Sequence, residues 1–304
     1  MICKVLEGLV REHLSEFMKT NKLLSPKQYG FIKGRSTTLQ LLKVLDDWTR
    51  SLEKGKQIDT IYMDFKKAFD TVPHRRLIGK LKSYHISAEL TRWIENFLEE
   101  REQHVGINGK VSRWHKIMSG IPQGSVLGPF LFVLYINDLP DTLESTPYMY
   151  ADDTKIYRNI EGRHDIATLQ TDLNKLQHWS DKWLLRFHPD KCKQLTIGRQ
   201  HFDTEYHLYT DEGNQRKQAI LEKCAQEKYI GVVMDNDLSF EQHMSDKIKK
   251  ANSIMGVIRR TFNNLNNTIF IMLYKGLVRP HLEYASSVWA PHKAKNIIAL
   301  EKVQ

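Results

Sequence analysis

The sequence predicts an α+β fold in which helices and antiparallel strands follow one another along the chain. Of the 304 residues, 41% are hydrophobic, which is enough to build a sizeable core. Apolar residues recur at helical spacing in several segments, and short alternating segments with hairpin turns lie between them. This interleaving favours an α+β architecture over a doubly wound parallel sheet.

Helical spacing of apolar residues predicts most of the elements. The first helix covers about residues 2–18, with Ile2, Val5 and Leu9 on its apolar face. It begins without a preceding loop or cap, so we expect the sequence to be a truncated piece of a longer protein. A basic loop follows over residues 23–38. Further helices are expected over residues 38–52, 68–84, 88–100 and 166–183.

Strands are predicted by alternating side chains and by turn residues. Residues 57–64 alternate as in a strand. Residues 105–111 predict a hairpin, because Asn108 and Gly109 supply the two positive φ angles of a tight turn. A second extended pair is expected around residues 148–157.

The pattern changes toward the end of the chain. From about residue 237 it becomes helix-rich and basic. We therefore expect a boundary near Ser239, which separates residues 1–238 from a helical part over residues 239–304.

Charge and cysteine content narrow the function classes. Forty-five Lys and Arg residues against 36 Asp and Glu give a net charge of +9, which favours a polyanionic partner such as nucleic acid over plain solubility charge. The three cysteines form no CxxC pair, so neither a zinc knuckle nor a disulfide framework is indicated. We find no signal peptide and no apolar run near the ~20 residues of a membrane span. We expect an intracellular protein of the cytoplasm and nucleus that has no membrane partner.

Three carboxylates are candidate catalytic groups. Asp152 and Asp153 lie between two aromatic-rich extended segments, and both can serve one site only where the chain turns. Placing two acids there is costly unless a cation is bound, although aspartates also favour ordinary turns. Asp64 ends the strand over residues 57–64, where it could instead be an N-cap. If the three meet, they would hold two Mg²⁺ ions for phosphoryl transfer.

A glycine-rich stretch runs from Gly120 to Pro129. Its spacing matches neither a P-loop nor a dinucleotide fingerprint. We interpret it as a stiff turn in which Gly124 allows a close approach to the backbone, followed by an apolar helix. A plain tight turn is the alternative interpretation.

The order of these motifs resembles the reverse transcriptases, specifically those of non-LTR (LINE) retrotransposons of the jockey and chicken-repeat type. The resemblance covers nearly the whole chain. It depends on several blocks in a fixed order, which are Gln28-Tyr29-Gly30-Phe31 with Gly34-Arg35-Ser36-Thr37, Asp64 with Phe69, Pro122-Gln123-Gly124-Ser125, Tyr135-Ile136-Asn137-Asp138, and Tyr150-Ala151-Asp152-Asp153.

The resemblance implies a right-hand polymerase fold, with fingers, palm and a partial helical thumb from about Ser239. It also implies an RNA-directed DNA polymerase in which Asp64 and Asp152 coordinate both Mg²⁺ ions and Asp153 is the auxiliary acid. Mn²⁺ could substitute for Mg²⁺. Lys191 would protonate the pyrophosphate leaving group. Phe69 would exclude a ribose 2′-OH, and the remaining substrate-binding residues would be Gln123, Gly124, Arg35 and Tyr150.

The partners implied are an RNA template, a DNA primer and deoxynucleoside triphosphates. The parent protein would be a longer retrotransposon polyprotein with an endonuclease. His188 and Lys66 depart from the residues common in the family, and neither change removes a catalytic carboxylate. One alternative is a catalytically inactive, retrotransposon-derived remnant that binds nucleic acid. A group II intron-type maturase ranks lower, because that role needs an added basic domain.

Overall fold

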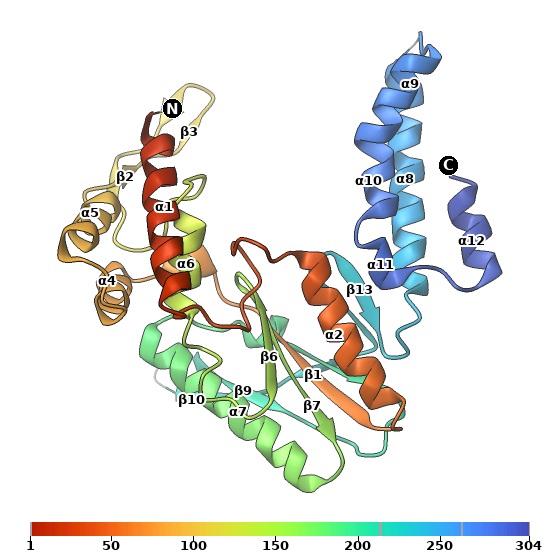
Figure 1. Ribbon diagram of the computed structural model, residues 1–304, viewed down its shortest axis with the longest axis horizontal. Coiled ribbons are helices and arrows are strands. Elements are labelled where there is room, and N and C mark those ends of the chain that lie inside the picture. The colour runs from red at the N-terminus through yellow and green to blue at the C-terminus, as the bar shows by residue number, and fades with distance from the viewer. Residues whose placement is uncertain (1, 213–214, 263, 304) are drawn as a thin grey trace. The chain divides into compact units, whose positions relative to one another are not determined.

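The computed structural model describes residues 2–212, 215–262 and 264–303 (Figure 1). The chain divides into two compact units. Unit 1 consists of Met1–Arg35, Asp59–Gln194 and Phe202–Glu222, and unit 2 of Ser36–Ile58, Leu195–His201 and Lys223–Gln304. These units and the boundary expected near Ser239 are different partitions of the chain, and that boundary stays a prediction.

The helices follow the predicted order with few exceptions. Those before the last strand are α1 (Ile2–Thr20), α2 (Thr37–Leu52), α3 (Ala68–Thr71), α4 (His74–Ser83), α5 (Ala88–Leu98), α6 (Gly128–Ile136), α7 (Arg163–Trp183) and the short η1 (Pro189–Lys191). Those after it are α8 (Glu241–Thr261), α9 (Asn267–Leu273), the π-helical η2 (Tyr274–Val278), α10 (Arg279–Glu283), α11 (Ser286–Trp289) and α12 (Ala294–Glu301).

The main sheet has five strands in the order β11-β8-β1-β7-β6. Its members are β1 (Gln57–Met63), β6 (Thr146–Tyr150), β7 (Asp153–Ile160), β8 (Lys193–Ile197) and β11 (Glu222–Cys224). The strand predicted over residues 57–64 is confirmed as β1. All its residues are buried, as expected for a strand in the middle of a sheet, so its alternating pattern does not mark a solvent-facing side. Figure 1 shows α7 lying along β7, which it contacts.

The other strands form small two-stranded sheets. They pair β9 (His207–Glu212) with β10 (Gln215–Ile220), β12 (Gln226–Tyr229) with β13 (Val232–Asp235), β2 (Glu102–Gln103) with β5 (His115–Lys116), and β3 (Gly106–Ile107) with β4 (Lys110–Val111). The last pair confirms the predicted hairpin, because Asn108 has φ +49 and Gly109 has φ +76.

Two helix predictions need correction. Residues 68–84 do not form one helix, because Pro73 ends α3 and begins α4 through its fixed φ and missing N–H. In the first half of α1, the predicted apolar face is exposed at Ile2, Val5 and Leu9, whereas Glu7 is buried. Glu7 faces inward because one of its carboxylate oxygens accepts hydrogen bonds from the N–H groups of Val126 and Leu127 at the start of α6.

Unit 2 contains the helix-rich end of the chain. Figure 1 shows α8 and α10 running side by side, and the two helices are in contact. His243 of α8 is buried against Trp289, and its Nδ1 accepts a hydrogen bond from the Val233 N–H. Burial lowers the pKa of His243 to about 4, so its ring is neutral at physiological pH. No helix within the described residues combines the length and apolarity that a membrane span needs.

A lysine is buried in the core of unit 1. Lys80 of α4 is 3% exposed, and its ammonium donates to the Tyr135 carbonyl and the Asp138 carboxylate. It also lies 3.9 Å from the ring centroid of Trp183 and 4.9 Å from that of Trp179. Burial lowers the pKa of Lys80 to about 8, against the opposing effect of Asp138.

The Lys80 pKa predicts a pH-dependent stability. Because the pKa of Lys80 is lower in the folded chain than the ordinary 10.5, the unfolded chain binds more protons between about pH 8 and pH 10.5. The contribution of Lys80 to the free energy of unfolding therefore rises with pH across that window. We expect the parent to gain about 1–2 kcal/mol relative to Lys80→Met between pH 7.5 and pH 9.5, measured by urea unfolding. The control Lys82→Met, at an exposed position of the same helix, should show the same pH dependence of the free energy of unfolding as the parent. If the difference in free energy of unfolding between the parent and Lys80→Met does not change with pH, the prediction is wrong.

Candidate active site

The chain leaves β1 at Asp64, and its backbone is fixed there on both sides. The Asp64 carbonyl accepts from the His188 N–H at 2.8 Å, and the Asp64 N–H donates to the Cys192 sulfur at 3.4 Å. The rings of Phe65 and Phe187 stack with centroids 4.6 Å apart. Burial raises the pKa of Cys192 to about 12, so the thiol is a neutral partner at physiological pH. These contacts hold the Asp64 side chain at the end of the sheet.

Asp152 and Asp153 lie at the tip of the β6–β7 hairpin. Tyr150 pairs with Asp153, so Ala151 and Asp152 form a two-residue connection. Ala151 has φ +53, a left-handed conformation that is uncommon for a residue with a Cβ. The strand, turn and strand expected from the sequence are therefore present, and the turn lets neighbouring aspartates serve one site.

The structure brings the three predicted carboxylates together. β1 and β7 are neighbours in the sheet, which places Asp64 beside the hairpin tip. Burial raises the pKa of Asp153 to about 6, and the charges of Asp152 and Asp64 raise it further. Burial also raises the pKa of Asp152, with a further contribution from Asp64. The carboxylates thus repel one another, which is the cost predicted for such a cluster without a cation.

The chemistry of this cluster fits a hard divalent cation. It offers carboxylate oxygens, which suit Mg²⁺ or Mn²⁺. A cation would also relieve the repulsion that adds to the effect of burial on the pKa of Asp152 and Asp153. Within the part of the chain that the structure describes, no three His, Cys, Asp or Glu side chains form a ready-made ligand group. The assignment of the three aspartates as metal ligands stays a prediction.

Lys191 is beside the same cluster. It lies on η1, and its ammonium is 3.7 Å from an Asp64 carboxylate oxygen. Its side chain is 64% exposed, so the ammonium can reach a solvent-borne substrate while it remains next to Asp64. The structure therefore places Lys191 beside Asp64, and its role as a proton donor stays a prediction.

Gln28 supports the hairpin tip from the adjacent loop. It is fully buried, and its Oε1 accepts from the N–H groups of Gly30 at 2.7 Å and Ala151 at 2.9 Å. The main chain adds a parallel bridge, in which the Tyr29 N–H donates to the Met149 carbonyl at 2.8 Å. This amide side chain thus satisfies the backbone of the strained turn that carries Asp152.

Gly30 is required by the same contact. A Cβ at this position would lie 2.3 Å from the Ala151 nitrogen and 3.0 Å from the Tyr150 carbonyl carbon. Only a residue without a side chain lets the loop approach the hairpin this closely. Sequence reasoning placed Gln28 and Gly30 in a motif but did not find this role, since 123 residues separate Gln28 from Ala151.

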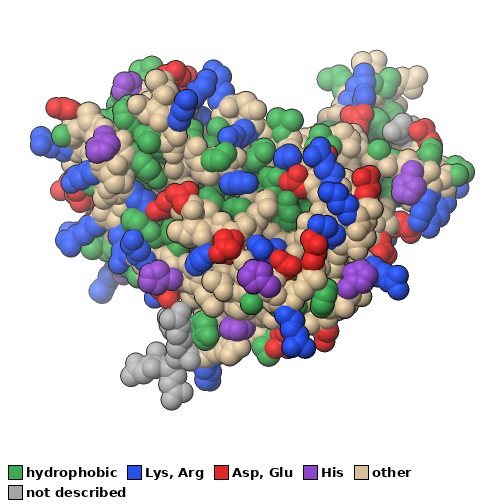
Figure 2. All heavy atoms as spheres, turned by 60° about the horizontal axis from the view of Figure 1, so that its bottom comes forward, with side chains coloured by type: hydrophobic (Ala, Val, Ile, Leu, Met, Phe, Trp, Pro, Cys, Tyr) green, Lys and Arg blue, Asp and Glu red, His purple; other side chains and the backbone are tan. Residues whose placement is uncertain are grey.

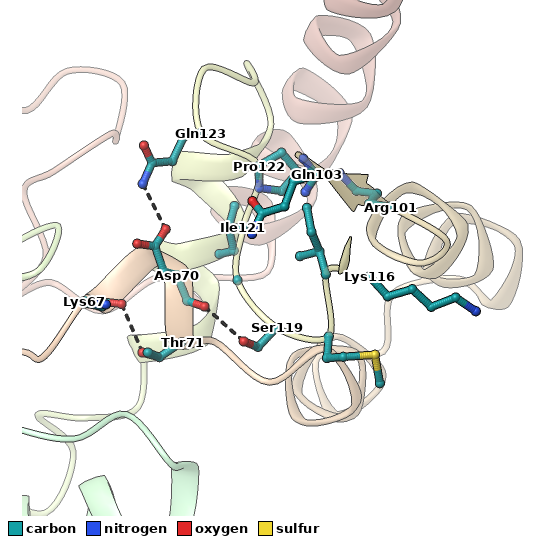
Figure 3. Close-up of a pocket in the computed structure, with 13 residues that line it drawn as sticks. Lys67, Asp70, Thr71, Arg101, Gln103, Lys116, Ser119, Ile121, Pro122 and Gln123 are labelled. Carbon is teal, nitrogen blue, oxygen red and sulfur yellow. Dashed lines mark hydrogen bonds between the residues drawn. The ribbon is translucent and has the colours of Figure 1, made fainter. Parts of the chain in front are cut away.

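The segment before α6, which carries Gln123, is hydrogen-bonded to the segment that carries Phe69 and Asp70. The Ile121 N–H donates to the Phe69 carbonyl at 2.7 Å, and Gln123 Nε2 donates to an Asp70 carboxylate oxygen at 2.9 Å. Figure 3 shows Gln123 pointing at Asp70 and Ser119 hydrogen-bonded to the Asp70 backbone. A Cβ on Gly120 would lie 2.7 Å from the Asp70 carbonyl oxygen, so the two segments are in direct backbone contact.

The predicted substrate-binding residues have different surroundings. The Phe69 ring stacks on Phe132 of α6 with centroids 4.4 Å apart, which is a core contact. Gly124 is exposed with φ +81 and open space around its Cα. Tyr150 is half-buried at the end of β6.

Arg35 is engaged within its own loop. Its guanidinium donates to the carbonyls of Ser25, Pro26 and Gln28, and it lies 5.2 Å from the ring centroid of Tyr29. These contacts hold the loop that carries Gln28. The assignment of Arg35 to template or triphosphate contact stays a prediction.

Charges of both signs are mixed on one face of the molecule. In the face shown in Figure 2, Lys and Arg side chains are interspersed with Asp and Glu. The net charge of +9 is therefore not gathered into one continuous patch on this face.

Solved structures with a similar fold include telomerases. A telomerase from Candida tropicalis matches with a TM-score of 0.57 at 10% identity, covering 98% of this chain and 49% of that chain. A telomerase from Candida albicans, in complex with a TWJ fragment of telomeric RNA, matches with a TM-score of 0.54 at 11% identity, covering 99% and 54%. These likenesses confirm the predicted right-hand polymerase fold.

Similar sequences come from mobile elements. The RNA-directed DNA polymerase from mobile element jockey of Drosophila funebris is 30% identical over 305 residues, covering 94% of this chain and 32% of the relative. The probable RNA-directed DNA polymerase from transposon X-element of Drosophila melanogaster is 26% identical over 316 residues, covering 100% and 34%. The chain thus spans about a third of the length of these curated relatives.

The family itself is shown by a match over most of the chain. Residues 1–234 match the model described as reverse transcriptase (RNA-dependent DNA polymerase), and the chain belongs to this family.

Proposed function

We propose that the chain is an RNA-directed DNA polymerase that adds deoxynucleotides to the 3′-OH of a DNA primer on an RNA template. The observation that supports this most directly is the convergence of Asp64, Asp152 and Asp153: burial raises the pKa of Asp152 and Asp153, and the charge of Asp64 raises both further. Carboxylates from two neighbouring strands at one point are the arrangement that in-line phosphoryl transfer uses. Family membership and the jockey and X-element relatives support the same reaction.

In this proposal, Asp64 and Asp152 hold both metal ions and Asp153 is the auxiliary acid. When bound, two Mg²⁺ ions would lower the pKa of the primer hydroxyl and neutralise charge on the leaving pyrophosphate. The residues' own contribution is to fix the positions of the carboxylate oxygens. The His188 and Cys192 contacts do this for Asp64, and Gln28 does it for the hairpin tip.

Lys191 donates a proton to the leaving pyrophosphate. Its ammonium is held 3.7 Å from Asp64, which keeps a proton donor next to the metal-binding carboxylates. Because it is a cation, it also attracts the charge that develops on the departing phosphate oxygens.

Phe69 sets the choice of sugar. Its ring is held by stacking on Phe132, so it is a rigid wall against a ribose 2′-OH. Gln123 and Gly124 line the nascent base pair, and Gly124 has open space in front of its backbone. Arg35 and Tyr150 complete the proposed substrate-binding set.

The proposed partners follow from the reaction. They are an RNA template, a DNA primer and deoxynucleoside triphosphates, held by contacts to the nucleic-acid backbone that tolerate any sequence. We further propose that the chain acts in the cytoplasm and nucleus, within a longer retrotransposon polyprotein that includes an endonuclease.

Removing one metal-binding charge tests the site. We expect Asp152→Asn to lower primer extension by several orders of magnitude on poly(rA)/oligo(dT) with Mg²⁺, because the variant lacks a carboxylate that would coordinate both ions. Asp46→Asn removes an exposed carboxylate of unit 2 and should extend primers like the parent. Equal activity of Asp152→Asn and parent would refute the site. A parent that binds the hybrid without extending it would identify the inactive remnant instead.

The proposed role of Phe69 in excluding a ribose 2′-OH predicts a change in substrate selection. We expect Phe69→Ala to raise ribonucleotide incorporation roughly tenfold or more relative to deoxynucleotide incorporation, because the wall that meets the 2′-OH is removed. The measurement is single-nucleotide addition with each triphosphate. Phe69→Tyr keeps the ring and its stacking, so it should keep the parent's discrimination. Unchanged discrimination in a folded Phe69→Ala variant would contradict the role.

The support of the hairpin tip predicts a defect in turnover. In Gly30→Ala the new Cβ would overlap the Ala151 nitrogen, so the tip must shift and kcat should fall at least ~10-fold. Gln28→Ala should act in the same direction, because two buried N–H groups lose their acceptor at a cost of about 1–3 kcal/mol. Gly79→Ala, at a helical position with nothing within 4 Å, is the matched control. If Gly30→Ala turns over like Gly79→Ala, the contact does not position the carboxylates.

A further inference from the structure

A cavity of about 750 Å³ lies beside the segment that carries Gln123 (Figure 3). Three cations line it, namely Lys67, Arg101 and Lys116, and its single carboxylate, Asp70, is hydrogen-bonded to Gln123. In the described part of the chain none of these cations forms an ion pair, and Lys67 and Lys116 are exposed. A concave surface with a surplus of unpaired cations is suited to a ligand with several negative charges.

One wall of the cavity belongs to a protruding arm, residues 101–118. Its base is the β2–β5 pair, in which Glu102 lies opposite Lys116, and its tip is the β3–β4 pair. The arm contains one carboxylate, Glu102, and four cations, which are Arg101, Lys110, Arg113 and Lys116. The arm is thus strongly basic.

The arm also exposes an aromatic ring. Trp114 is 61% exposed although it makes an edge contact with His104, with ring centroids 4.0 Å apart. The contact fixes the indole while most of its surface stays open. An exposed, fixed indole among cations is the combination by which proteins bind single-stranded nucleic acid, since an unpaired base stacks on the ring and phosphates meet the cations.

We propose that the arm and the cavity bind the single-stranded part of the RNA template. Arg101, Lys116 and Lys67 contact phosphates, and Trp114 stacks on an unpaired base. Because the cavity floor runs into Gln123, a strand held here continues into the base pair being formed, so this step rests on the proposed polymerase function. Duplex nucleic acid fits less well, because its bases are already stacked and paired.

Binding of matched hybrids tests the proposal. One DNA–RNA hybrid is blunt, and the other carries a 5′ RNA overhang of about ten nucleotides, within the usual site size for single strands. We expect the parent to bind the overhang hybrid more tightly by fluorescence anisotropy. The double variant Arg101→Ala, Lys116→Ala should remove most of that gain. It should also reduce the slope of log Kd against log salt concentration by about 1.4, since each lost phosphate contact contributes roughly 0.7 to the slope.

Changes at Trp114 test the stacking separately. Trp114→Ala should weaken binding of the overhang hybrid roughly fivefold to 150-fold without affecting the blunt hybrid, and Trp114→Phe should restore most of the loss. Val105→Ala removes exposed apolar surface of the same arm without a π face and should bind like the parent. Lys19→Ala with Arg163→Ala removes two exposed cations on other helices and is the charge control.

The outcomes separate this proposal from the polymerase function. Binding can be scored in a chain that extends no primer, so failure of extension refutes only the function. Equal affinity of parent and arm variants for the overhang hybrid would overturn the proposal. So would equal losses on both hybrids, or a loss in Val105→Ala as large as in Trp114→Ala, because an apolar protein partner would then explain the surface better.

Discussion

Repulsion among three carboxylates is the constraint on which the rest of the candidate site depends. Burial raises the pKa of Asp152 and Asp153, and the charge of Asp64 raises the pKa of both further, as does the charge of Asp152 for Asp153. The structure restrains each backbone with neutral partners. A main-chain N–H and a protonated thiol hold Asp64, and a glutamine amide holds the hairpin tip. These neutral partners fix the backbone without adding charge. The Lys191 ammonium, 3.7 Å from an Asp64 carboxylate oxygen, offsets part of the negative charge, and the remainder stays available to attract a cation.

The hairpin tip also stores conformational strain. Ala151 has φ +53, and a left-handed residue with a Cβ costs of the order of 1–3 kcal/mol unless its surroundings enforce it. Gln28 and Gly30 are those surroundings, since one accepts from the Ala151 N–H and the other leaves room for it. The loop of residues 27–30 is therefore part of the active-site support, although it carries no reacting group.

Local patterns predicted most elements, and failures came where long-range contacts decided the outcome. The Asn108-Gly109 turn and the Asp152-Asp153 hairpin were predictable because both depend on short-range backbone geometry. The exposed face of α1 was not, because the acceptor needed by Val126 and Leu127 fixes which side faces inward.

The candidate site shows the same division. The motifs single out Asp64, Asp152 and Lys191 as candidates, whereas their proximity depends on how β1, β7 and η1 come together in the fold. No local signal distinguishes Gln28 from other loop glutamines, because its acceptor role exists only once β6 and the loop are paired. The charge pattern of the sequence likewise does not predict that Arg35 donates to three carbonyls of its own loop.

The short segment before α6 connects the proposed nucleotide site with the proposed template path. Its backbone is hydrogen-bonded to Phe69 and Val72 and is in direct contact with Asp70 through Gly120. One side of the segment therefore fixes Gln123, and the other forms the cavity floor. Because close-packed segments transmit strain, an RNA strand that displaced the cavity floor would also displace Gln123. In the proposed function, this contact would couple the position of the template to the position of the incoming nucleotide.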